Sequence, residues 1–272
     1  MPGKIKFAIV FLIVSLTGTL SYVYSDTLYT RYLTFWFVSV KKMHAADALS
    51  QVRIMRSRHD AALARTPKRE DREALTLSFD NEYGQYLSHM LRVFSPDERD
   101  PEKLSSDVNE LRRTAGFYYL EKGDILRGVS LVLSSIGKDV GRDEEVPFMR
   151  AIGAMYDTHM YTDIIAELSW RKYGEKTDLL FWHGASFYYL KNYKEAVVLF
   201  HRCITAGRND DSVNYMLASS LMEMKLYSEA IVYARKALEM SPKNHEVRSL
   251  LVNLLNHEKQ FREAEKVSRA QR

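Results

Sequence analysis

The sequence predicts an all-α protein in which one N-terminal transmembrane helix precedes an α-solenoid of about four or five helix–turn–helix units. Three observations predict this architecture. Residues 7–24 form an uncharged apolar run, apolar residues from about position 43 onward recur at helical spacing, and segments of thirty-four residues repeat beyond residue 176. The predicted parts are an anchor or signal segment (1–25), an aromatic and basic helical region (26–94), a linker (95–103) and the solenoid (104–272).

Composition excludes several classes of protein. The 272 residues are 46% hydrophobic and 27% charged, which is typical of a folded chain rather than a disordered one. The single Cys excludes a disulfide framework and a metal site built from several thiolates. The formal charge of +4 is too small to indicate binding to nucleic acid, and we expect no such partner.

The run at residues 7–24 is long enough to cross a membrane. As a helix, FAIVFLIVSLTGTLSYVY covers about 27 Å, close to the hydrocarbon thickness of a bilayer. Lys4 and Lys6 precede it, which favours a cytoplasmic N-terminus and places the bulk of the chain on the trans side, the periplasm in a bacterium. Aromatic residues at its far end suit a membrane interface and favour a retained anchor: Tyr22, Tyr24, Tyr29, Tyr32, Phe35, Trp36 and Phe37.

Two other interpretations of this segment stay open. Lys4 and Lys6 also suit the n-region of a signal peptide, and Val23 and Ser25 are acceptable small residues before a cleavage site near Ser25. Cleavage there would give a periplasmic or secreted chain. The remaining interpretation is a buried core helix that is apolar on all sides.

Apolar spacing predicts helices over about 43–65 and about 70–94. The first helix carries a basic cluster of Arg53, Arg56 and Arg58 on its polar face. A solvated helix face explains such a cluster, and contact with anionic lipid headgroups or with an acidic partner is the alternative. The segment SPDERDPEK at 95–103 contains two Pro and many charges, which predicts an internal boundary.

The strongest pattern is the repeat of thirty-four residues. Clear units cover 177–210 and 211–244, and a third begins at 245 and extends to 272. Two weaker units cover about 107–140 and about 145–176. Aromatic residues and alanines recur at the repeat interval in the clear units: Tyr193, Tyr227 and Phe261, and Ala196, Ala230 and Ala264.

These units resemble the tetratricopeptide repeat (TPR), a helix–turn–helix family. That family favours small residues where its two helices cross, and Gly184, Ala196 and Cys203 occupy such positions in the first clear unit. Cys203 is therefore expected to pack in the core rather than to act as a reactive thiol. Arg208 departs from the family pattern, which favours proline at that position. The resemblance implies a solenoid in which each unit covers the apolar face of its neighbour.

The resemblance also implies a concave surface lined by the first helices of successive units. The chaperone-binding members of the family hold a peptide carboxylate there with Lys, Asn and Arg, which Phe181, Ala185 and Ser219 of this chain cannot do. We therefore expect an apolar or aromatic partner segment. The alternative is that the aromatic residues only pack between units. The predicted groove residues are Tyr118, Phe181, Ala185, Tyr188, Tyr215, Ser219, Met222 and Asn253.

The sequence contains no motif for catalysis, for a metal or for a cofactor, and we expect none of these. The leading prediction is a membrane-anchored, non-catalytic scaffold or adaptor that binds a protein partner. We expect it in a bacterial envelope assembly of the secretion, pilus or flagellar type. A secreted or periplasmic chaperone-like carrier of apolar peptide segments is the alternative, and a homo-oligomer is compatible with either.

Overall fold

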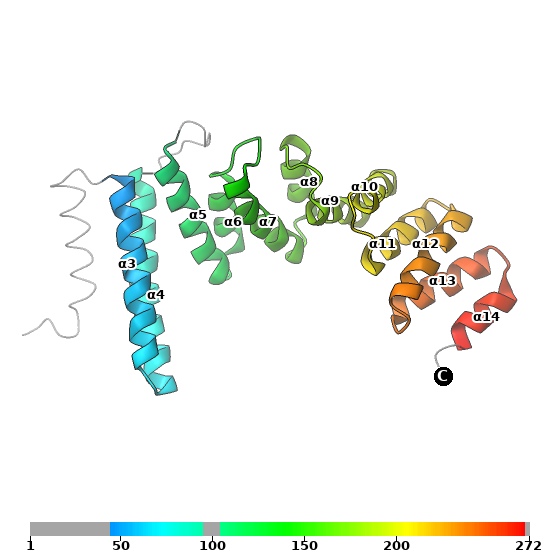
Figure 1. The fold of residues 1–272 in the computed structure, drawn as a ribbon, viewed down its shortest axis with the longest axis horizontal. Helices are drawn as coiled ribbons and strands as arrows, with labels where there is room; N and C mark the ends of the chain where they lie inside the picture. Colours follow the sequence, from blue (N-terminus) through cyan, green and yellow to red (C-terminus); the bar gives the residue numbers. More distant parts are fainter. Residues whose placement is uncertain (1–43, 95–103, 270–272) are drawn as a thin grey trace, which may run out of the picture. The chain divides into compact units, whose positions relative to one another are not determined.

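The computed structural model describes residues 44–94 and 104–269, which form the twelve α-helices α3 to α14 (Figure 1). The all-α prediction is confirmed for these residues, which also contain one isolated parallel bridge between Asp139 and Lys172. Among the helices of the described ranges, none is long and apolar enough to cross a membrane. The predicted membrane segment at 7–24, the cleavage site near Ser25 and the linker at 95–103 lie outside the described residues.

The chain divides into two compact units, residues 1–118 and 119–272. The division falls within α5 (Ser106–Glu121), later in the chain than the predicted linker. Each unit is therefore described by itself.

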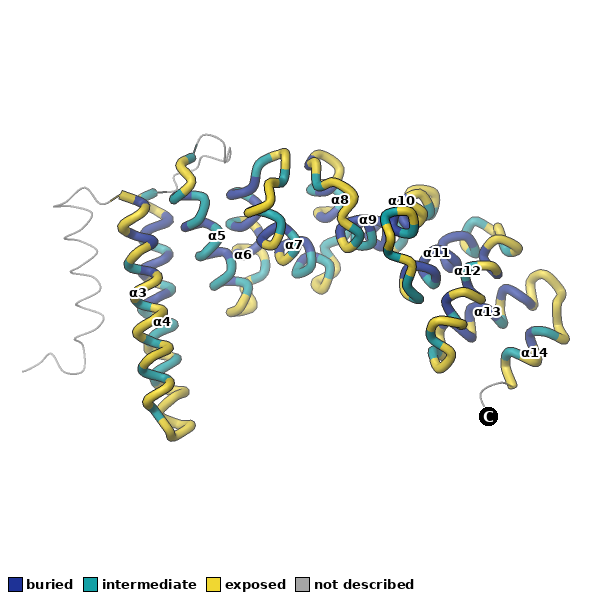
Figure 2. The backbone as a smooth tube through the Cα atoms, viewed as in Figure 1, coloured by how far each residue is buried: buried dark blue, intermediate teal, exposed yellow. Residues whose placement is uncertain are grey.

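Unit 1 contains an antiparallel hairpin of α3 (Ala45–Arg65) and α4 (Arg69–Phe94). Pro67 lies in the turn, where a residue without a backbone donor is tolerated. No side chain between residues 53 and 82 is buried, so the core is confined to the start of α3 and the end of α4 (Figure 2). The buried residues of the hairpin are Ala45, Ala48, Leu49, Val52, Tyr83, Tyr86, Leu87, Met90 and Leu91.

A row of aromatic rings joins α3, α4 and α5 in unit 1. The His59 ring stacks on Phe79 at 4.0 Å, Phe79 stacks on Tyr83 at 4.9 Å, and Tyr83 meets the edge of Tyr118 at 5.3 Å. The Tyr118 hydroxyl donates a hydrogen bond of 2.7 Å to the Asp80 carbonyl. Tyr118 is half-buried, and its expected place in the groove stays a prediction.

Unit 2 contains helices that pair as helix–turn–helix hairpins (Figure 1). The weaker early units contribute α6 (Ile125–Leu133), α7 (Arg142–Asp157) and α8 (Tyr161–Trp170). Each clear unit contributes one pair: α9 (Thr177–Tyr189) with α10 (Tyr193–Thr205), α11 (Asp211–Glu223) with α12 (Tyr227–Met240), and α13 (His245–His257) with α14 (Phe261–Arg269).

Small residues lie where paired helices cross. Ala196 and Cys203 are fully buried, and a Cβ built on Gly184 would lie only 3.0 Å from the Phe200 ring. Burial raises the pKa of the Cys203 thiol to about 12, so the thiol stays protonated and inert. The packing role expected for Cys203 is therefore consistent with its surroundings. Arg208, where the family favours proline, forms ion pairs with Asp178 (2.7 Å) and Asp210 (2.8 Å).

Every hairpin turn of unit 2 holds one residue in the left-handed backbone conformation. These residues are Gly123, His159, Lys191, Lys225 and Lys259, with φ between 58° and 81°. At the α9–α10 turn, Lys191 N–H donates to the Tyr188 carbonyl and Asn192 N–H donates to the Phe187 carbonyl, both at 2.8 Å. The same bond pair recurs at the other four turns, and it satisfies carbonyls that the end of a helix leaves open.

Glycine at the turn lysines should stabilise unit 2, because a side chain with a Cβ is disfavoured at positive φ. We expect Lys191→Gly and Lys225→Gly each to raise the free energy of unfolding by about 1 kcal/mol. Gly123→Ala should lower it by a similar amount. Urea unfolding followed by circular dichroism measures these changes.

The matched control is Lys236→Gly in the interior of α12, where φ is helical and glycine should cost about 1 kcal/mol. Equal destabilisation by Lys191→Gly and Lys236→Gly would show that the left-handed turn carries no special strain.

Candidate functional site

Six tyrosines from five consecutive helices gather on unit 2, and we call them the tyrosine array. Each of the helices α7 to α11 contributes at least one of them. Tyr189 is exposed and the other members are half-buried. The members are Tyr156, Tyr161, Tyr188, Tyr189, Tyr193 and Tyr215.

Ring contacts run through the array both within hairpins and between them. Within hairpins, Tyr156 meets Tyr161 at 6.0 Å and Tyr188 meets Tyr193 at 5.6 Å, both edge to face. Between hairpins, Tyr161 stacks on Tyr189 at 4.6 Å. Tyr189 also meets the edge of Tyr188 at 5.5 Å, so five of the six rings, all but Tyr215, form one connected set of aromatic contacts.

The phenol groups of the array are neutral hydrogen-bonding groups. Burial raises the pKa of Tyr156, Tyr161, Tyr188, Tyr193 and Tyr215 above the usual value of 10. The Tyr161 hydroxyl has a partner, since it meets His159 Nδ1 at 2.8 Å. This bond and the stacking on Tyr189 hold the Tyr161 ring in place.

The predicted groove residues of unit 2 differ in how deeply they are buried. Tyr188 and Tyr215 belong to the array, and half-buried Phe181 lies under the Arg208 guanidinium at 4.3 Å. Ala185 is fully buried and Ser219 is 3% exposed, so the expectation that these two contact a partner is corrected, and they lie in the core beneath the surface. Asn253 is exposed, with its Nδ2 at 3.8 Å from the Met222 sulfur.

Sequence reasoning did not select Tyr156, Tyr161, Tyr189 and Tyr193. The positions of these tyrosines relative to the turn between the paired helices were the signal that could have selected them. Tyr156 and Tyr188 each come three residues before a left-handed residue, while Tyr161 and Tyr193 each come two residues after it. A hairpin turn brings these two positions together, so the pairs could have been expected to touch.

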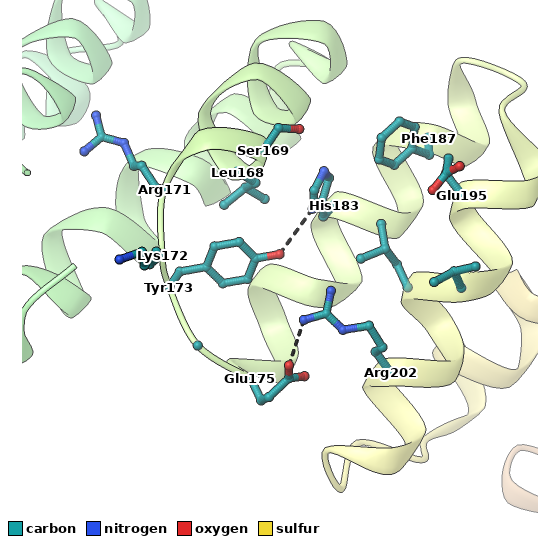
Figure 3. Close-up of a pocket in the computed structure, with 13 residues that line it drawn as sticks. Leu168, Ser169, Arg171, Lys172, Tyr173, Glu175, His183, Phe187, Glu195 and Arg202 are labelled. Carbon is teal, nitrogen blue, oxygen red and sulfur yellow. Dashed lines mark hydrogen bonds and ion pairs between the residues drawn. The ribbon is translucent and has the colours of Figure 1, made fainter. Parts of the chain in front are cut away.

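A pocket of about 490 Å³ lies beneath the α8–α9 connection (Figure 3). Its wall includes Tyr173, His183, Phe187 and Arg202, and Arg202 forms an ion pair of 2.7 Å with Glu175. In Figure 3 the Tyr173 hydroxyl points toward His183, and it meets His183 Nδ1 at 3.2 Å. The Nε2 atom of His183 is buried without a hydrogen-bond partner among the described residues.

An early helix end explains this pocket. Helix α8 ends at Trp170 and spans ten residues, whereas α10 spans thirteen. The chain then runs extended, held by the bridge to Asp139 and by buried Arg171, which donates to the carbonyls of Leu133 and Gly137. The missing last turn of α8 leaves space beside α9.

His183 should make the stability of unit 2 depend on pH. Burial, with the nearby Arg202 charge, lowers the pKa of His183 from 6.5 to about 4. The unfolded chain therefore binds this proton between pH 6.5 and 4 while the folded chain does not, so stability falls as pH decreases through that window. Between pH 7 and 4.5 the loss due to His183 should be about 2–3 kcal/mol.

The pH dependence of the wild type's stability is compared with that of the variant His183→Leu. Leucine is chosen because it occupies the equivalent buried positions 217 and 251 of the following units. Urea unfolding of both proteins, followed by tryptophan fluorescence, should give a stability difference that changes in favour of the variant as pH falls. An unchanged difference from pH 7 to 4.5 would contradict the burial of a neutral His183.

The three arginines of the basic cluster lie on α3 and differ in their contacts. Arg53 donates to Glu110 Oε1 at 2.5 Å within unit 1, while Arg56 and Arg58 are exposed on α3. Contact of these arginines with lipid or with an acidic partner stays a prediction. The part of the chain that the structure describes holds no group of three or more candidate metal ligands.

Comparisons with known proteins agree with this architecture. Residues 221–269, which run from the end of α11 to the end of α14, match the tetratricopeptide repeat family. No curated protein matches the chain in sequence. A crystal structure of MamA protein is similar, with a TM-score of 0.55 and 13% identity over 61% of this chain and 91% of that one. The similarity to MamA 41-end from Desulfovibrio magneticus RS-1 covers 80% of this chain and 92% of that one at 15% identity, with a TM-score of 0.34.

At 13% identity the first likeness shows the fold alone. The matched repeats and the shared fold together show a helical solenoid with tetratricopeptide repeats, an architecture that commonly mediates contacts between proteins.

Proposed function

We propose that the chain is a non-catalytic scaffold that holds a protein partner on the tyrosine array. The observation that carries this proposal is the continuity of the ring contacts over the four helices α7 to α10 without complete burial of the rings. Tyrosine supplies a large apolar contact area and a hydroxyl for hydrogen bonding, and it is enriched among the residues that dominate binding energy at protein interfaces. Packing between units alone would not require an exposed ring such as that of Tyr189.

The fixed positions of the rings also support this proposal. Ring contacts within and between hairpins and the Tyr161–His159 hydrogen bond already order most of the array. Little side-chain entropy is then lost when a partner binds, which favours affinity. The architecture supports a segment of a partner chain as the ligand.

The scaffold would be fixed to a membrane through residues 7–24, with the solenoid on the trans side as part of a bacterial envelope assembly of the secretion, pilus or flagellar type. The uncharged run and its aromatic border in the sequence support this part of the proposal. Sequencing the N-terminus of the mature chain tests it. A chain that begins at Asp26 would instead support the carrier that is released after cleavage near Ser25.

Site-specific photocrosslinking in intact cells tests the binding surface. A photoreactive phenylalanine analogue replaces Tyr188 or Tyr189 in the full chain, and adducts are identified by mass spectrometry. Because both residues belong to the array, we expect both positions to give an adduct with the same partner. The matched control is Val232 on α12, an exposed residue outside the array, which should give none.

An adduct from Val232 alone would contradict the assignment of this surface. The absence of adducts from all three positions in cells that express the folded chain would count against a scaffold that binds through the array.

A further inference from the structure

We infer that the C-terminal end of unit 2 binds an acidic helix of a partner protein, and that a carboxylate of this helix pairs with Arg248. The site is a pocket of about 310 Å³ formed by α13 and by Ser268 of α14, which we call the terminal pocket. The terminal pocket shares no residue with the tyrosine array. This inference therefore goes beyond the proposed function and does not depend on it.

The terminal pocket corresponds to a surface that is covered in the preceding unit. There α13 packs against both α11 and α12, and Asn214, Ala218 and Ala234 are fully buried. The residues thirty-four positions later all line the terminal pocket: Arg248, Val252 and Ser268. Because Ser268 is exposed and Val252 is only half-buried, no helix of the described ranges covers this surface. The crossing of α13 and α14 thus offers a partner helix the kind of surface that α11 and α12 offer to α13.

The terminal pocket is polar, unlike an ordinary surface for packing between repeats. Its exposed polar residues on α13 are His245, Ser249, Asn253 and Asn256. None of the described residues that line it is acidic. An apolar helix would deprive these groups of water without giving them hydrogen bonds. The pocket therefore suits a helix that carries polar side chains.

Arg248 gives the terminal pocket a buried positive charge. This residue is 9% exposed. Its Nη2 donates to the Pro242 carbonyl, while its Nε is buried without a hydrogen-bond partner among the described residues. Within residues 44–94 and 104–269 it forms no ion pair. A guanidinium keeps its proton in a protein, so its burial without a counter-charge costs free energy.

Arg171 shows the contacts that Arg248 lacks. Arg171 is buried to a similar extent, at 7% exposed, but its Nε pairs with Glu167 at 2.9 Å and its other nitrogens donate to the Leu133 and Gly137 carbonyls. A carboxylate matches the planar fork of a guanidinium and can accept two of its hydrogen bonds. An Asp or Glu side chain of a partner helix would therefore supply to Arg248 what Glu167 supplies to Arg171.

The test is selection of helical peptides by the full chain. A phage library of alanine-rich helical peptides with one randomised face is panned on the immobilised full-length protein in mild detergent, with detergent-treated beads as background. Three proteins are panned in parallel: the wild type, Arg248→Gln, and the control Arg262→Gln, which changes an exposed arginine of α14 outside the pocket. Circular dichroism verifies that all three are folded.

We expect the wild type and Arg262→Gln to enrich peptides with Asp or Glu on the randomised face, and Arg248→Gln to lose them. By fluorescence anisotropy, the best acidic peptide should bind Arg248→Gln about tenfold more weakly than the wild type, and Arg262→Gln within about twofold of it. Replacing the acidic residue of the peptide by its amide should weaken binding to the wild type by a similar factor. The same replacement should change binding to Arg248→Gln by less than about twofold, which shows that the two groups pair directly.

A second measurement needs no neutral variant at this position. The Nε–H resonance of Arg248 in the wild type, assigned by comparison with Arg248→Lys, should shift as the acidic peptide is added and should not shift with the amide peptide. This titration decides the question even where Arg248→Gln does not fold.

The inference is overturned if the wild type enriches no acidic helix, or if the acidic peptides bind Arg248→Gln as tightly as the wild type. A dimer of the wild type, seen by light scattering and lost in Arg248→Gln, would assign the terminal pocket to a second copy instead of a partner. Each of these results leaves the proposed function of the tyrosine array standing, because no residue is common to the two sites.

Discussion

The left-handed residue in each turn is the constraint on which unit 2 depends. It reverses the chain within three residues and lets two backbone N–H groups satisfy the carbonyls at the end of the first helix, as at Lys191 and Asn192. The second helix then begins at a fixed position relative to the first. Only with that position fixed can Gly184 and Ala196 allow the paired helices to approach closely.

The same constraint builds the tyrosine array. Because Tyr188 lies three residues before the left-handed residue and Tyr193 two residues after it, the turn brings the two rings to 5.6 Å. Tyr156 and Tyr161 repeat this arrangement around His159, with rings 6.0 Å apart. Stacking of one hairpin on the next then places Tyr161 against Tyr189. A candidate binding surface thus follows from hairpin geometry that stability already requires.

The sequence predicted the helical repeats well because their causes are local. Ala196 and Ala230 are thirty-four residues apart because the two helices of each unit cross at the same position. Both alanines are buried at that crossing. The candidate site was predicted only in part. The burial of a residue depends on the neighbouring helices that cover it, and the position of the residue within its repeat does not show them. Ala185 was expected to contact a partner in the groove, but it is fully buried.

At the junction between α8 and α9, the hydrogen bonds of Arg171 interrupt the regular geometry of the repeats. Arg171 bonds to carbonyls near the end of α6, and this bonding needs the extended chain that follows Trp170, so α8 loses the turn that would have covered His183. A buried imidazole with an unpaired Nε2 remains where the next units have leucine. Burying an unpaired polar group costs stability, so His183 weakens this junction. The array crosses the same junction through the stacked rings of Tyr161 and Tyr189. A partner that covers both rings would therefore stabilise the solenoid at this junction, and binding and stability of unit 2 should be coupled there.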